Sequence, residues 1–304
     1  CEMAGEAKNP SKTLPFAIIG SITITLAIYL ILQFTFASSL TAANLKNGFD
    51  GLHFASPFPT ILAQDKLKNL NPLLTVGAIL GPLAAALMYM SSAGRSLYGS
   101  STNGYLPTFL QKLNPQGNPL YGIAFSFLLG MLMFTQMHSW QVMAEFLNLL
   151  MALSYAIAPV CLLTLRRQLP QQARPFRLPF AYLWANLAFI LCNLITYFTG
   201  WEIISKLCIA LLAGIIILFS YHRLSERGKS ISFDWRASVW LWPYLVGISL
   251  ISYLGQFNGK GIIPPGWDYL IIAAFSVAIM HLAIHFRLDD KMTQEYITDL
   301  NLKA

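Results

Sequence analysis

A single acid, Glu145, lies in the apolar run 140–165, which carries no other charged residue. Asn148, Ala152 and Tyr155 follow it at spacings that put all four on roughly one face of a helix. An acid inside a membrane helix costs about 3 kcal/mol near its centre, and burial favours its protonated form. Glu145 is therefore a candidate proton carrier, and its polar and small neighbours would line a pathway. The alternative is an acid at the membrane interface whose carboxylate reaches water.

Small residues form a stripe in the apolar run 72–93. One face of this run carries Gly77, Gly81, Ala84, Ala85 and Met88. Glycines four positions apart let two helices approach closely, so helix packing is the main interpretation. Met88, on the same face, is a second candidate for lining a transport pathway.

Hydroxyl residues four positions apart, Ser21 and Thr25, lie in the run 14–36. Hydroxyls in membrane helices usually bond to the backbone of their own helix. We therefore weigh two interpretations, packing within the membrane and lining of a transport pathway.

Two further pairs have the spacing of side chains on one helix face. His281 and His285 have the spacing of two metal ligands, but no acid lies within one turn of either on the predicted span 267–286, so we expect no metal site. Glu202 and Lys206 are most simply a local ion pair. The chain has no glycine-rich phosphate loop, no nucleophile elbow and no cysteine–histidine cluster with metal spacing. We therefore expect no cofactor and no enzyme activity.

These residues must be positioned by long apolar runs. Of the 304 residues, 56% are hydrophobic and 11% are charged, whereas soluble domains carry about 25% charged residues. Crossing the hydrocarbon layer takes about 20 apolar residues in a helix. We predict eight spans, near 14–36, 72–93, 120–136, 140–165, 180–199, 202–221, 237–255 and 267–286. The runs do not alternate with a period of two, so an all-α integral membrane protein is predicted instead of a barrel.

The basic residues are distributed unevenly between the loops. If the N-terminal segment is cytoplasmic, fifteen of the twenty lysines and arginines lie on the cytoplasmic side. Because cytoplasmic loops are enriched in these residues, we predict that the N-terminal segment and the C-terminus are both cytoplasmic. The protein is expected to be a multi-pass protein of the cell (plasma or inner) membrane, in contact with lipid. The net charge of +7 then follows from topology and indicates no nucleic-acid partner.

Two loops are informative. In the outer loop 37–71, a Pro-Phe-Pro sequence precedes residues 60–64, which form a candidate short helix over the outer face. The inner loop 94–119 is too polar to cross the membrane, and its glycines and prolines rule out one continuous helix.

The segment 5–17 resembles a block of the amino acid–polyamine–organocation superfamily, G-E-x-K-N-P followed by P-x-A. The matching residues are Gly5, Glu6, Lys8, Asn9 and Pro10, with Pro15 and Ala17. In that family the block follows transmembrane helix 6. Two later segments also resemble family loops, 94–107 the loop after helix 8 and 174–179 the loop after helix 10. The resemblance covers roughly residues 1–222.

The resemblance implies a fold of two inverted five-helix repeats, in which the eight spans are helices 7–14. Residues 1–13 would be the end of helix 6 and a cytoplasmic loop, 14–165 helices 7–10, 166–222 helices 11 and 12, and 223–304 a two-helix extension with a cytoplasmic tail. Helices 1–5 and most of helix 6 would be missing. The chain begins without Met inside a polar motif, so we expect residue 1 to be a truncation point and the piece alone not to transport. With the missing helices the protein would have fourteen, and in this it resembles the aspartate–proton symporter branch of the superfamily.

In this family the substrate binds at the membrane midplane, where helices 1 and 6 are unwound. In sodium-coupled relatives helix 8 supplies hydroxyl ligands, and Ser91 and Ser92 are placed for that role. We predict secondary active transport of amino acids by alternating access, with protons favoured over sodium as the coupling ion. Acidic amino acids are the substrates that the branch match implies.

Two other functions stay open. One is an amino acid exchanger, and the other is a membrane protein that no longer transports and serves as a sensor or assembly subunit. A membrane enzyme is a weaker alternative, because no catalytic constellation is present. The sequence does not indicate an oligomeric state.

Overall fold

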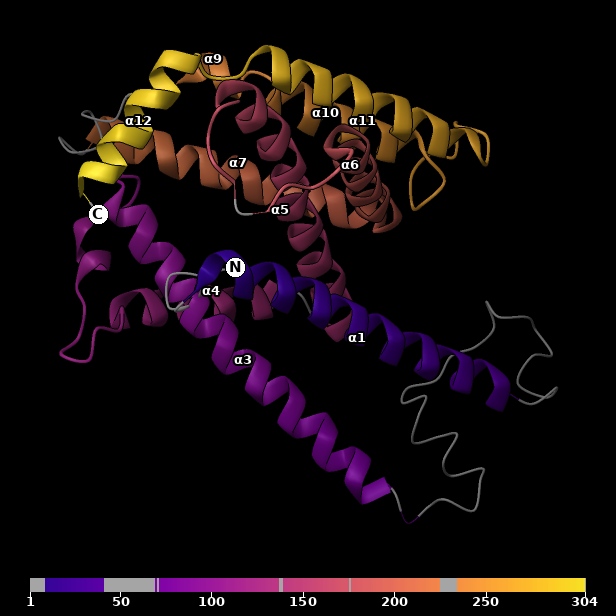
Figure 1. Cartoon of the computed structure of the whole chain (residues 1–304). Helices are drawn as coiled ribbons and strands as arrows, with labels where there is room; N and C mark the ends of the chain where they lie inside the picture. Colours follow the sequence, from indigo (N-terminus) through magenta and orange to yellow (C-terminus); the bar gives the residue numbers. More distant parts are fainter. Residues whose placement is uncertain are drawn as a thin grey trace. The chain divides into compact units, whose positions relative to one another are not determined.

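Every regular element in the described residues is a helix. The computed structural model describes residues 9–40, 69, 71–136, 139–174, 176–224 and 234–303. Figure 1 shows the elements α1 (Pro10–Ser39), α3 (Asn71–Thr102), η4 (Thr108–Gln111), α4 (Leu120–Gln136), α5 (Trp140–Gln168), α6 (Ala181–Phe198), α7 (Gly200–Leu224), α9 (Trp235–Ser238), α10 (Leu241–Leu254), α11 (Trp267–His285) and α12 (Asp290–Lys303). The predicted all-α fold class is therefore confirmed.

Seven helical segments of the described chain are long and apolar enough to cross a membrane. They are α1, α3, α5, α6, α7, the pair α9–α10 and α11. The predicted span 120–136 coincides with α4, whose 17 residues are fewer than the roughly 20 that a crossing needs. Eight crossings and two inverted repeats therefore stay predictions, whereas a multi-pass membrane protein is supported.

Three segments differ from the expected boundaries. Helix α3 continues past the predicted end at residue 93 to Thr102, so the loop 94–119 begins as helix and contains the single turn η4. The span predicted at 237–255 is interrupted at Val239 and Trp240, between α9 and α10. The polar C-terminal tail forms α12, which apolar periodicity did not indicate.

Several predicted features fall on residues outside the described ranges. The candidate helix 60–64 and the motif residues Gly5, Glu6 and Lys8 are among them. The motif residues Asn9 and Pro10 begin α1, where Pro10 takes the first helical position. Proline suits that position because the N–H that it lacks would have no partner inside the helix.

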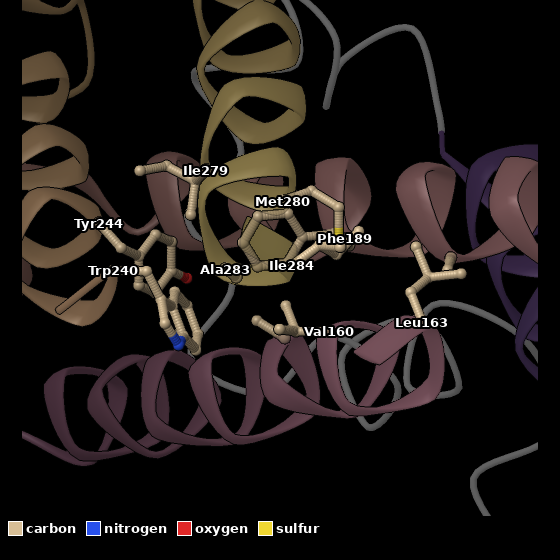
Figure 2. Packing of buried hydrophobic residues seen from close by; sticks show 11 residues of the cluster. Val160, Leu163, Phe189, Trp240, Tyr244, Ile279, Met280, Ala283 and Ile284 are labelled. Atoms are coloured by element: carbon tan, nitrogen blue, oxygen red, sulfur yellow. The ribbon is translucent and has the colours of Figure 1, made fainter. Parts of the chain in front are cut away.

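The hydrophobic core lies where α5, α6, α10 and α11 meet. Figure 2 shows Val160 of α5, Phe189 of α6 and Met280 of α11 converging there, with Trp240 and Tyr244 at one side. A lipid tail is as apolar as leucine, so these contacts stabilise through close packing more than through removal from water.

Buried polar side chains also join α6 to α10 and α11. The Asn193 Nδ2 donates to the Ser276 Oγ of α11 at 2.9 Å, and the Tyr244 hydroxyl of α10 donates to the Asn193 Oδ1 at 2.7 Å. Asn193 and Ser276 are fully buried. Such bonds between membrane helices are each worth about 0.6–2 kcal/mol and fix the register of the helices.

Helices α1 and α3 contrast with this packing. Residues 1–94 form one compact unit and 95–304 another. The most apolar windows of α1 and α3 have mean hydropathies of 2.2 and 1.9, yet the described chain buries no residue within these windows. Helices that are apolar on all sides require a surrounding of low polarity, which lipid or further protein supplies.

Candidate functional site

A groove of about 530 Å³ lies along the N-terminal half of α5 and the C-terminal end of α6. Its lining comprises Glu145, Asn148, Met151, Ala152, Tyr155, Ile195, Phe198, Thr199 and Asn258. The four residues that the sequence analysis placed on one face of the helix therefore all line one groove.

The packing of α5 explains why this face is left open. Leu149 and Ala156 are buried against the neighbouring helices, Leu149 with residues of α7 and Ala156 in the hydrophobic core of α5, α6, α10 and α11. Glu145 and Tyr155 project beside this buried face and stay exposed. Ala152 is 5% exposed and lines the groove between them, where its single methyl group leaves space.

The polar groups of the groove are available to a ligand. Within the described ranges, the Glu145 carboxylate makes no hydrogen bond or ion pair, and the amides of Asn148 and Asn258 make no side-chain hydrogen bond. The Thr199 hydroxyl donates to the Thr196 carbonyl oxygen at 2.7 Å and can still accept a hydrogen bond. A carboxylate, two amides and a hydroxyl beside Met151, Ile195 and Phe198 suit a small ligand with both charged and apolar parts.

The burial expected for Glu145 is not supplied by the described part of this chain, because its side chain is exposed. Any removal of Glu145 from water would have to come from lipid or from protein outside these ranges. Its role as a proton carrier stays a prediction.

The other candidate residues belong to the unit 1–94, whereas the groove is built from the unit 95–304. Ser21 is exposed and donates to the Ile18 carbonyl oxygen at 3.0 Å, the local bond that hydroxyls in membrane helices usually make. Thr25 and Met88 are exposed, and Ser91 and Ser92 are half-buried. Their roles in a pathway or a cation site stay predictions.

Two pairs predicted from their spacing remain, the ion pair and the two histidines. The Lys206 Nζ lies 3.0 Å from the Glu202 Oε1, which confirms the ion pair. His281 has both ring nitrogens engaged, Nε2 with the Tyr182 hydroxyl at 2.9 Å and Nδ1 with the Val277 carbonyl oxygen at 2.8 Å. Over the described ranges, no three or more potential ligands gather at a metal-binding distance.

Three further polar residues, Thr199, Asn258 and Asp268, were not predicted from the sequence. Asn258 precedes Gly259, and Asn-Gly is a strong turn signal that could have marked a structured loop. Asp268 is 2% exposed in the first turn of α11, where an acid complements the helix dipole. Its Oδ2 accepts from the Tyr197 hydroxyl at 2.9 Å, and its Oδ1 accepts from the backbone N–H groups of Gly266 and Tyr269 at 3.0 Å each.

Comparisons with known proteins agree with the fold. Residues 1–218 match the family described as amino acid permease. The chain is 32% identical to the glutamate/serine transporter AimA of Bacillus subtilis over 278 residues, which cover 90% of the chain and 51% of that protein. It is 30% identical to the aspartate-proton symporter of Bacillus subtilis over 92% of the chain and 55% of that protein. It is 24% identical to the branched-chain amino acid permease BcaP of Bacillus subtilis over 74% of the chain and 47% of that protein.

The chain spans about half the length of the curated relatives that it matches. The family match ends at residue 218 in α7, whereas the alignments with AimA and the aspartate-proton symporter cover 90% and 92% of the chain and so extend past α9 and α10 into α11. No solved structure matches the chain significantly. These relatives are transporters and not enzymes by their names. The chain is therefore a multi-pass membrane protein that belongs to the amino acid permease family of the amino acid–polyamine–organocation superfamily.

Proposed function

We propose that the protein containing this chain is a secondary active transporter that moves amino acids across the cell membrane by alternating access. In this proposal α1–α7 correspond to helices 7–12 of the family fold, and α9–α11 form the two-helix extension. The N-terminal segment and the C-terminus face the cytoplasm, as the distribution of lysine and arginine indicates.

The observation that carries the proposal is the groove beside Glu145. Family membership accounts for membrane residence and a permease fold, but it does not select residues. The groove adds an acid without a partner in the described chain, two free amides and apolar side chains in one place. An amino acid has the matching chemistry, with an ammonium group that can donate to a carboxyl oxygen of Glu145 in either protonation state and a carboxylate for an amide donor.

We propose that protons are the coupling ion and that Glu145 carries the proton. The aspartate-proton symporter and the glutamate/serine transporter suggest acidic amino acids and serine as substrates to test. An ionised Glu145 would repel an acidic substrate, and protonation would remove this repulsion. Substrate and proton would then enter the groove together, which is the basis of symport.

The test is uptake of labelled glutamate, aspartate and serine by the full-length protein in proteoliposomes. Glu145→Gln imitates the protonated acid, so we expect an imposed pH gradient to stop driving uptake while exchange of substrate against substrate persists. Glu202→Gln is the matched control, because Glu202 is an ion-paired acid on α7 that does not line the groove. Unchanged stimulation of the Glu145→Gln variant by the pH gradient would contradict the proton role.

Transport assays in the same vesicles distinguish symport from exchange, from binding without transport and from sodium coupling. Counterflow without gradient-driven uptake in the unsubstituted protein would indicate an exchanger, and binding without flux would indicate a sensor or assembly subunit. Loss of uptake when sodium is replaced by choline would favour a sodium site, for which Ser91 and Ser92 are the residues to substitute.

A further inference from the structure

The loop between α10 and α11, residues 255–266, is held firmly against the junction of α6 and α7. The Tyr197 hydroxyl of α6 accepts from the Gln256 N–H at 3.1 Å and donates to the Asp268 Oδ2 at 2.9 Å. The Trp201 N–H of α7 donates to the Phe257 carbonyl oxygen at 3.0 Å. The start of the loop, at Gln256 and Phe257, and the first turn of α11 that follows the loop are therefore attached to helices that lie within the permease family match.

Two glycines allow this close approach. A Cβ at Gly255 would overlap the Tyr197 ring, and a Cβ at Gly200 would lie 3.1 Å from the Phe257 carbonyl oxygen and 3.2 Å from the Asn258 Nδ2. Gly200 also has a φ of +81°, which a side chain rarely adopts. The contact between the loop and the helix junction is thus direct, with no room for an intervening side chain.

This attachment brings Asn258 to the groove of Glu145. Asn258 has a φ of 53°, a left-handed conformation that asparagine tolerates better than most residues. Its side chain lines the groove, and its amide makes no hydrogen bond with the described residues. A free amide on a rigidly held loop is prepared to bind a ligand, because little conformational freedom is lost on binding.

We infer that the two-helix extension completes the substrate groove, with the Asn258 Nδ2 donating a hydrogen bond to the carboxylate of the amino acid as it passes Glu145. This inference rests on the proposed transport function and deepens it. It assigns a substrate-binding residue to α9–α11, a segment that lies beyond the family match. The extension then contributes to substrate recognition as well as to packing.

The experiment measures KM and maximal uptake of the full-length protein in proteoliposomes. Asn258→Gly removes the amide while keeping a backbone that accepts positive φ, so strain is not confused with loss of the hydrogen bond. We expect KM to rise about tenfold, the effect of losing one hydrogen bond to a charged group, with maximal uptake nearly unchanged. Lys260→Ala is the matched control, because Lys260 is exposed in the same loop and does not line the groove.

Asn258→Asp is the second variant, since aspartate also tolerates this backbone. The added negative charge should raise KM more for glutamate than for serine. A KM unchanged in both variants, with uptake by the unsubstituted protein intact, would overturn the inference and leave the proposed function standing. Absence of any amino acid uptake by the unsubstituted protein would overturn both. An effect of Lys260→Ala as large as that of Asn258→Gly would also overturn it, because the loop as a whole and not the amide would be responsible.

Discussion

Helices α1 and α5 are alike in sequence character and unlike in their surroundings. They have 30 and 29 residues, and their most apolar windows have mean hydropathies of 2.2 and 2.0. The described chain buries 39% of that window in α5 and none of it in α1. Hydropathy thus determines that a helix enters a membrane, but it does not determine which helix it packs against.

Small and polar side chains explain why α5 is packed against neighbouring helices and α1 is not. In α5 and α6, buried Ala156 and Ala185 permit close approach, and in α6 Asn193 bonds to partners on two other helices. Packing between membrane helices depends on such features because lipid covers apolar surface as favourably as another helix does. Helix α3 has the small residues Gly77 and Gly81, but no other described segment comes within 4 Å of an added Cβ at either position.

The largest effect is expected from removing Asp268, which would weaken the packed region. Asp268→Ala leaves the Tyr197 hydroxyl and two backbone N–H groups without their acceptor. We expect a loss of about 3 kcal/mol or more in stability, seen as a lower midpoint of thermal unfolding in detergent. Asp268→Asn keeps one acceptor oxygen and should lose less. An unchanged midpoint for Asp268→Ala would show that the network does not stabilise the packed region.

A smaller effect is expected from a methyl group added between α10 and α11. A Cβ at Gly247 of α10 would overlap the ring of Phe275, which packs against the core. We expect Gly247→Ala to cost about 1–3 kcal/mol in the same thermal assay. Gly214→Ala in α7 is the matched control, because nothing lies within 4 Å of its added Cβ. Equal midpoints for the two variants would contradict the packing of α10 on α11.

The smallest effect is expected from a larger side chain in the glycine stripe of α3. The stripe of Gly77 and Gly81 is predicted to pack against a segment outside the described residues, so Gly81→Leu should cost about 1 kcal/mol in the full-length protein. Ala86→Leu is the control, since Ala86 is on the opposite side of the helix at about 100° per residue. If both variants unfold at the same temperature, lipid and not protein covers the stripe.

Much of the candidate site could be predicted from one helix. Glu145, Asn148, Ala152 and Tyr155 share a face by periodicity alone, and the structure places all four on one groove. Thr199 and Asn258 could not be assigned in this way, because they reach the groove from other segments of the chain. Only contacts such as that between the Trp201 N–H and the Phe257 carbonyl oxygen bring these segments together.

The all-α membrane class, the positions of most apolar helices and the family could be predicted from the sequence, because they depend on local composition, period and a short motif. The packing of α11 on α6, the burial of Asp268 and the approach of the extension's loop to the groove beside Glu145 are visible only in the folded chain. Apolar helices all suit a membrane equally well, so their neighbours are selected by a few small and polar side chains. The partners of those side chains lie far away in the sequence, as Asn193 and Ser276 do.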